Sequence, residues 1–427
     1  MKNLLLIYFG KTVSKIARTL NLGNGSTWPG HIALLVNKKI ISELLSRSHV
    51  KIILIAGTNG KTTTARLIRT VLEENGKKVI QNRSGANLLN GIASSLLLHT
   101  DVLGRLKQDY ALFEVDENIL PLILKEIKPD YLILLNLFRD QLDRYGEVNT
   151  IAKKWKNSLE QLSEETMVIL NADDPQIAFL GEKRKNIKYF GCSDVLIHQN
   201  KLEHAADSVF CPRCNAQLVF KTVYFSHLGE WYCEKCSLRR PRLDDSNFQV
   251  YPLSGIYNKY NTLAAVLLLN QVGVKKQTIE KSFSDFKPAF GRQEKVLYKG
   301  KSVQLFLSKN PTSFNQSYTT IRDLGAKSLL IVLNNKIPDG RDVSWIWDVD
   351  LPGIESFKHI LISGDRVYDM ALRLKYEDYK NFQTYQDLTD AVKDGVKLIN
   401  KDETFYILPT YSAMLEVRKV LTGKKIL

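Results

Sequence analysis

Short apolar runs alternate with amphipathic helical stretches along most of the chain after Val50. The apolar runs include residues 51–56, 110–115 and 131–136, and a helical stretch at 62–75 follows the first of them. Alternation of this kind is typical of a parallel β-sheet covered by helices. The pattern therefore predicts an α/β fold.

The same alternation returns in the second half of the chain. A helix is predicted at 259–272, and a fresh set of strand-like runs begins near Val303 and continues at 328–333, 359–363 and 404–408. Helical sequence separates these runs, so we predict a second, smaller α/β domain. Between about 197 and 252 the pattern breaks into an insert with cysteines and clustered aromatic residues.

The amino terminus follows a basic amphipathic pattern. Apolar positions between residues 5 and 20 recur at helical spacing, separated by Lys11, Lys15 and Arg18. The apolar stretch 4–9 is too short to span a membrane, and no small-residue cleavage site follows it. Such a helix either packs on the main domain, which we favour, or lies on a membrane surface. We expect a cytoplasmic chain, with peripheral association at the inner face of the membrane as a further option.

Length and charge narrow the classes of partner. The 427 residues are enough for two or three domains, and the formal net charge of +15 favours anionic ligands. The basic residues are spread along the chain without one long run or interleaved aromatic residues. We therefore expect nucleotides or pyrophosphates as ligands and no nucleic-acid partner.

A glycine-rich loop directly follows the first predicted strand. Its glycines allow backbone amides to face a phosphate, and the helix that follows adds partial positive charge. Lys61 can reach the terminal phosphates and a threonine hydroxyl can ligate Mg²⁺. A purely structural glycine turn is the alternative. We predict that ATP binds to Gly57, Thr58, Asn59, Gly60, Lys61, Thr62 and Thr63.

Carboxylates follow the next two predicted strands, at the sheet edge where ligands of such folds bind. Glu114 is the first choice for a second Mg²⁺ ligand beside Thr62, and Asp116 is the second choice. Asp140 and Asp143 follow the strand at 131–135, where they either face the metal or cap the next helix.

Two Cys-x-x-Cys pairs lie within the insert and are separated by 18 residues. This spacing is a strong signature of a tetrahedral Zn²⁺ site with four thiolate ligands. Four thiolates leave no open position for water, which favours a structural over a catalytic role. A disulfide pair is the alternative, but a cytoplasmic chain disfavours it. The predicted zinc ligands are Cys211, Cys214, Cys233 and Cys236.

Several ordered motifs resemble those of the Mur ligase superfamily over roughly residues 40–427. The short loop Gly-Thr-Asn-Gly-Lys-Thr-Thr is the form found in Mur ligases and folylpolyglutamate synthases, and 171–175 reads Asn-Ala-Asp-Asp-Pro. The resemblance implies that Asn258 faces the adenine and that Arg292 contacts the phosphates. The chain departs from the family pattern at Gln141, in place of a histidine, and at 308–311, which lacks the family's Asp and His.

A Mur-type domain interrupted by a four-cysteine ribbon is similar to MurT-type subunits of lipid II isoglutaminyl synthase. This resemblance implies ATP-dependent amidation of the D-glutamate α-carboxyl in the lipid II stem peptide, through an acyl phosphate, to D-isoglutamine. It also implies a GatD-like class I glutaminase partner in a heterodimer. The carboxylate completing that partner's Cys-His pair would come from the acidic segment at 339–350, with Asp348 preferred over Asp350 and Asp342. Alternatively, these aspartates cap helices or bind solvent.

The remaining cysteine, Cys192, lacks the sequence of a nucleophile elbow, so no glutaminase nucleophile is expected in this chain. Two other functions stay open: a Mur or folylpolyglutamate-type ligase that adds an amino acid, and a zinc-ribbon ATPase acting on nucleic acid. The expected domains are an amino-terminal helical segment at 1–45, a central ATP-binding domain at 46–295 with a zinc ribbon at about 203–245, and a Rossmann-like C-terminal domain at 296–427.

Overall fold

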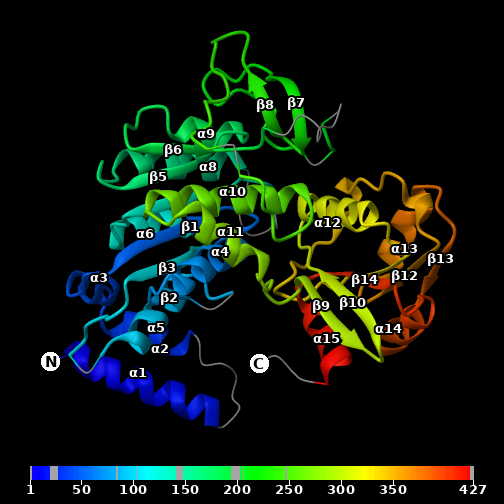
Figure 1. Ribbon diagram of the computed structural model, residues 1–427, viewed down its shortest axis with the longest axis horizontal. Coiled ribbons are helices and arrows are strands. Elements are labelled where there is room, and N and C mark those ends of the chain that lie inside the picture. Colours follow the sequence, from blue (N-terminus) through cyan, green and yellow to red (C-terminus); the bar gives the residue numbers. More distant parts are fainter. Residues whose placement is uncertain are drawn as a thin grey trace.

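The structure is a computed structural model that describes residues 2–19, 27–82, 85–101, 103–140, 148–193, 202–204, 206–245 and 248–423. Within these residues the strands form two six-stranded sheets and one two-stranded sheet. The two large sheets lie side by side, and the two-stranded sheet projects from the edge of the first near β5 and β6 (Figure 1). Gln141 and Asp143 lie outside the described residues.

The first sheet is entirely parallel, with the order β2-β3-β1-β4-β5-β6. Its central strand β1 is apolar on both faces, because Ile53 and Ile55 pack into one core cluster while Leu54 and Ala56 pack into the other. Burial on both faces explains the continuous apolar runs in the sequence. The strands are β1 (Lys51–Ala56), β2 (Val79–Gln81), β3 (Tyr110–Val115), β4 (Tyr131–Leu134), β5 (Met167–Asn171) and β6 (Ile187–Phe190).

Helices cover both faces of this sheet. One face packs against α4 (Lys61–Glu74), α10 (Ile256–Gln271) and α11 (Lys276–Ser284). The other face packs against α5 (Leu89–His99), α6 (Leu120–Glu126), α8 (Val148–Glu160) and α9 (Pro175–Leu180).

Three helices precede the first strand: α1 (Lys2–Thr19), α2 (Trp28–Val36) and α3 (Ile40–Ser46). Leu6 and Ile7 of α1 are buried in the core cluster of the first sheet. The opposite side of α1 remains exposed at Leu5, Tyr8 and Phe9. Among the described residues, no helix is both long enough and apolar enough to span a membrane.

The second sheet has the order β13-β12-β11-β14-β10-β9, and only the edge strand β9 runs antiparallel to its neighbour. Two apolar clusters flank it. Its strands are β9 (Arg292–Tyr298), β10 (Lys301–Phe306), β11 (Ser328–Val332), β12 (His359–Ser363), β13 (Phe382–Thr384) and β14 (Thr404–Pro409). Its helices are α12 (Pro311–Asp323), α13 (Val367–Tyr376), α14 (Leu388–Lys397), α15 (Tyr411–Thr422) and the 3₁₀ helices η1 (Ser344–Asp348) and η2 (Ile354–Ser356).

The insert contains an antiparallel hairpin, β7 (Val219–Phe225) and β8 (Leu228–Tyr232). Tyr224, Phe225 and Leu228 at its turn belong to the same core cluster as α4 and α10. Trp231 and Leu218 instead form a small cluster with the cysteines. The hairpin is therefore built into the core of the first domain at one end and carries the cysteines at the other.

Candidate active site

A cavity of about 380 Å³ lies between the two large sheets and is lined by residues from both. Nearly all the residues predicted to bind nucleotide or Mg²⁺ line it. They are Thr58, Asn59, Gly60, Lys61, Thr62, Thr63, Glu114, Asn258 and Arg292. Gly57 does not line the cavity, but its carbonyl oxygen accepts a hydrogen bond from Lys61 Nζ at 2.5 Å.

Both loop glycines are required by the local backbone. Gly57 and Gly60 have φ of +145° and +91°, in the range that favours glycine. A Cβ at position 60 would lie 2.0 Å from Asn261 Oδ1, and a Cβ at position 57 would lie 2.9 Å from Leu135 Cβ. Helix α4 begins at Lys61, immediately after the loop, so its free amides and partial positive charge face the cavity.

Lys61 and Thr62 both contact carboxylates. Lys61 Nζ lies 3.2 Å from Glu117 Oε2, and Thr62 Oγ1 donates to Glu114 Oε2 at 2.5 Å. Glu114 is held in place by Gln81, whose Nε2 donates to Glu114 Oε1 at 3.2 Å. A hydroxyl and a carboxylate converging at one point are hard oxygen donors of the kind that Mg²⁺ selects. Thr62 and Glu114 thus fit a magnesium ion. In this structure the Thr62 hydroxyl and the Glu114 carboxylate are hydrogen-bonded to each other.

A second group of charges faces the loop from the other domain. Lys309, just before α12, forms an ion pair with Asp140, which follows β4. Desolvation would lower the pKa of Lys309, but the charges of Asp140 and Glu117 hold it above its ordinary value. Burial, together with the charge of Glu117, raises the pKa of Asp116. The ion pair between Lys309 and Asp140 therefore joins the two domains beside the loop.

Sequence reasoning did not assign a role to Lys309 or Glu117. Lys309 stands in the segment 308–311, where the family's Asp and His are missing. That departure from the family pattern was the only sequence signal that another side chain could act at this place. Glu117 lies one residue beyond the two carboxylates considered at the end of β3. Asp140 was predicted to face the metal or to cap a helix. In the structure its carboxylate instead accepts a hydrogen bond from the Lys309 ammonium group, across the domain interface.

Asn258 and Arg292 reach the cavity from opposite sides of the junction between the domains. Asn258, in the first turn of α10, donates to the Ser254 carbonyl at 2.8 Å and accepts from Asn261 Nδ2 at 3.1 Å. Arg292 opens β9, and burial lowers its pKa while the negative charge of Glu114 opposes that shift. Arg292 is half-buried, and a guanidinium at this position can neutralise phosphate charge.

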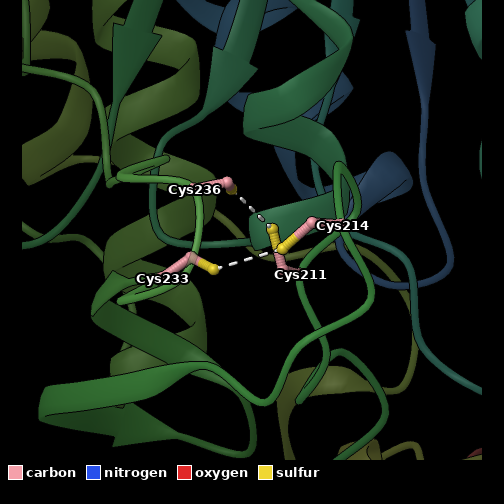
Figure 2. Close-up of side chains that lie close together, drawn as sticks. All are labelled: Cys211, Cys214, Cys233 and Cys236. Carbon is pink, nitrogen blue, oxygen red and sulfur yellow. Dashed lines mark hydrogen bonds between the residues drawn. The ribbon is translucent and has the colours of Figure 1, made fainter.

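The four cysteines of the insert converge. Their sulfur atoms all lie within 4.8 Å of one another, and the pairs Cys211–Cys236 and Cys214–Cys233 are each separated by 3.5 Å. Figure 2 shows the two side chains of each Cys-x-x-Cys turn facing those of the other turn. Zn–S bonds of about 2.3 Å in a tetrahedron place sulfur atoms at separations of this order, so the cluster fits a zinc ion.

The four aspartates between 339 and 350 have different surroundings. Asp339 is buried and accepts from the Ser412 amide at 2.7 Å, whereas Asp342 accepts from the Ser344 amide at 2.8 Å, next to η1. Asp350 bonds to His204 of the insert at 2.5 Å. Asp348 is 44% exposed and lies 3.6 Å from Arg139 of the first domain. Asp342 and Asp348 line a small surface pocket of about 60 Å³ that also includes Asp140 and Lys309.

Comparison with known proteins adds to this geometry. The Mur ligase middle domain family matches residues 55–269, and the family described as MurT ligase C-terminal matches residues 307–414. Similar solved structures include a pseudomurein peptide ligase type C from Methanothermus fervidus, with a TM-score of 0.67, 22% identity and coverage of 89% of this chain and 80% of that one. Another is the MurF ligase of Thermotoga maritima in complex with ADP, with a TM-score of 0.62, 16% identity and coverage of 90% and 81%. These likenesses establish the Mur ligase fold.

Two curated relatives are more similar in sequence. Both are named lipid II isoglutaminyl synthase (glutamine-hydrolyzing) subunit MurT. The protein of Staphylococcus aureus (strain COL) is 32% identical over 88% of this chain and 88% of its own length, and that of Streptococcus pneumoniae is 33% identical over 95% and 94%. The chain therefore belongs to the MurT family of the ATP-dependent Mur ligases.

Proposed function

We propose that the chain amidates the α-carboxyl of D-glutamate in the stem peptide of lipid II, giving D-isoglutamine, with ATP as the energy source. The observation that carries this proposal is the single cavity in which the phosphate loop, Glu114 and Arg292 meet residues of the C-terminal domain. The name of the MurT relatives, lipid II isoglutaminyl synthase, indicates the substrate and the product.

In the proposed reaction, a carboxylate oxygen of the substrate attacks the γ-phosphorus of ATP and ADP leaves. Ammonia then attacks the acyl phosphate, phosphate leaves, and loss of a proton gives the amide. Phosphoryl transfer needs charge neutralisation more than covalent chemistry from the protein. Lys61 and Arg292 supply positive charge from the two sides of the cavity. Magnesium, held by Thr62 and Glu114, would add charge stabilisation at the phosphates.

The four-cysteine cluster is proposed to hold one structural zinc ion. The cysteines flank the open end of the hairpin, away from the cavity, and four thiolates would complete a tetrahedral shell. Purified protein should contain about one zinc per chain, as measured by atomic spectroscopy. The Cys211→Ser, Cys214→Ser double variant should lose the metal and melt at a lower temperature. Zinc-free protein with unchanged melting behaviour would contradict the assignment.

A separate class I glutaminase is proposed to supply the ammonia. Cys192 is buried, with its amide donating to Asp173, which is the setting of a core thiol and not of an exposed nucleophile. Asp348 is proposed to complete the partner's Cys-His pair, because its carboxylate is the more exposed of the two favoured aspartates. Asp350 is already bonded within the chain to His204 and Asn315.

A peripheral membrane location is also proposed, through α1 and α2. Exposed Leu5, Phe9, Trp28 and Leu35 lie on these two helices, and the sequence contains no acidic residue before Glu43. Apolar side chains combined with positive charge suit an anionic lipid surface. Sedimentation with phosphatidylglycerol vesicles should carry the protein down, and a Leu5→Ser, Phe9→Ser variant should remain in solution. Equal sedimentation of both proteins would remove this proposal.

The central experiment combines the chain, its glutaminase, lipid II, ATP and glutamine carrying heavy nitrogen in the amide. Mass spectrometry should find labelled D-isoglutamine in the lipid II stem peptide. Replacing glutamine by ammonium should support the reaction without the glutaminase. A ligase that adds an amino acid is the competing function, and incorporation of an added amino acid in place of ammonia would favour it.

A further inference from the structure

The hairpin of the insert connects the cysteine cluster to the cavity. Cys214 lies before β7 and Cys233 directly follows β8, so the cysteines flank the open end of the hairpin. The turn at the opposite end consists of Ser226 and His227, which are buried together with the adjoining Phe225. An insert that only decorated the surface would have an exposed turn, and this one does not.

Phe225 forms part of the cavity wall. Its ring centroid lies 5.5 Å from that of Tyr260 on α10, with an interplanar angle of 77°, and 6.0 Å from that of Phe138 after β4. Tyr260 and Phe138 also line the cavity. Three aromatic rings from three separate segments therefore form one apolar wall, and one of the three belongs to the insert.

One buried carboxylate holds this wall in place. Asp173 accepts from Tyr260 Oη at 2.6 Å and from Arg240 Nε, in the insert, at 2.5 Å. Its carbonyl oxygen accepts from the Gly229 amide of β8 at 3.1 Å. Beside it, Trp231 of β8 donates to the Ala172 carbonyl at 3.1 Å. The insert and helix α10 are thus fixed relative to each other at the cavity edge.

The sheet order assigns the two sides of the cavity to different parts of a ligand. Strand β1 and its phosphate loop lie between β3, which ends in the carboxylates, and β4, after which Phe138 follows. Phosphates and their counterion belong at the loop and at Glu114. The aromatic wall lies on the other side of the loop, where a planar base can pack against rings.

We propose that Phe225, carried by the cysteine insert, forms part of the nucleoside-binding wall of the ATP site. The insert is then a component of the nucleotide site and not an appended module. This inference rests on the proposed function, because it takes the cavity to be the ATP site. It assigns to Phe225 contact with the base or ribose and none with the phosphates.

Calorimetric titration with a non-hydrolysable ATP analogue and with inorganic tripolyphosphate tests this assignment. In Phe225→Ala, the Kd for the analogue should rise by about ten-fold, a typical effect of removing one stacked ring. The Kd for tripolyphosphate should stay within about two-fold of wild type, since the phosphate loop is unchanged. Phe220→Ala is the matched control, because Phe220 lies on the same strand but packs against the cysteine cluster.

Phe225→Leu, which retains apolar volume, guards against a folding defect and should show the same selective loss with unchanged melting behaviour. Equal affinity of both Phe225 variants and wild type for the analogue would overturn the inference. Parallel weakening for both ligands would also overturn it, since Phe225 would then only support the fold. Lys61→Ala should bind neither the ATP analogue nor tripolyphosphate. If this variant bound both ligands with wild-type affinity, the proposed ATP site and the inference would both be wrong.

Discussion

The phosphate loop at 57–63 and the acidic segment at 339–350 were both singled out by their residue types, but the structure treats them differently. Every side chain of the loop lines one cavity, next to a glycine backbone that admits no other residue at two positions. The aspartates of the acidic segment have separate partners, although Asp342 and Asp348 line one small surface pocket. Asp339 is buried, Asp342 borders a 3₁₀ helix, Asp350 bonds to the insert, and Asp348 is half exposed.

The difference lies in what fixes each position. Backbone geometry fixes the loop, because positive φ at Gly57 and Gly60 and the start of α4 leave one arrangement of the amides. An acidic segment has no such restraint, and each carboxylate adopts the position given by its nearest donor. Residues in a loop motif can therefore be assigned together, whereas the aspartates must be assigned one at a time.

We expect the largest effect on activity from a change at Asp348, in contrast to the other aspartates of the segment. Asp348→Asn should lower glutamine-dependent amidation by about 10⁴-fold, because loss of the proposed triad carboxylate would leave the histidine of the proposed glutaminase wrongly oriented. Amidation with excess ammonium should be unchanged. Both rates are measured by lipid II mass spectrometry on the complex with the glutaminase. A parallel fall with both nitrogen donors would assign Asp348 to the fold instead.

Lys61→Ala should lower amidation by about 100- to 1,000-fold with either nitrogen donor, since it removes one positive charge from the transferred phosphoryl group. Lys77→Ala is the matched control, because Lys77 is exposed beyond the end of the same helix. Melting curves should coincide for the wild type and both variants. Activity of the Lys61 variant close to that of the control would remove the loop from the reaction.

Asp339→Ala should destabilise the protein by about 1–3 kcal/mol, because the buried Ser412 amide loses its acceptor. Burial raises the pKa of Asp339, so the folded state binds this proton more tightly than the unfolded state. The contribution of Asp339 to stability therefore declines as pH rises from about 4, the ordinary carboxyl value, through the folded pKa. Asp339→Asn should remove that pH dependence, as measured by denaturant unfolding across the acidic range.

Asp342→Asn should have the smallest effect. The side-chain oxygen of asparagine can accept the same hydrogen bond from the Ser344 amide. Stability should change by no more than a few tenths of a kcal/mol, and both nitrogen-donor activities should stay within about two-fold. A selective loss of glutamine-dependent activity here would transfer the proposed partner contact from Asp348 to Asp342.

The parallel sheets and the loop could be predicted because their signals are local. Strands buried on both faces give continuous apolar runs, as in β1 and β3, and the loop glycines stand directly after the first of these. The convergence of the four cysteines follows from their spacing. Each of these features depends on residues close together in sequence.

The other parts of the site depend on contacts between distant segments. Lys309 and Asp140 are 169 residues apart in the sequence. Phe225 contacts Tyr260 from an insert that packs into the domain core at one end and surrounds the cysteines at the other. Phe225 belongs to no motif, and Lys309 stands in a segment that departs from the family motif. A half-buried lysine and an aromatic residue in a hairpin are common features of any domain, so their sequence context does not distinguish them.

The contact between Asn59 of the loop and Asn310 at the start of α12 has a consequence for how long a nucleotide stays bound. Each amide donates to the oxygen of the other, at 3.4 and 3.3 Å, so two weak hydrogen bonds join the domains directly above the phosphate loop. A ligand enclosed between the domains can leave only when they separate. We therefore expect the residence time of bound nucleotide to follow the frequency of that separation. Weakening the pair with Asn310→Ala should therefore speed nucleotide release, as measured by displacement of a fluorescent nucleotide.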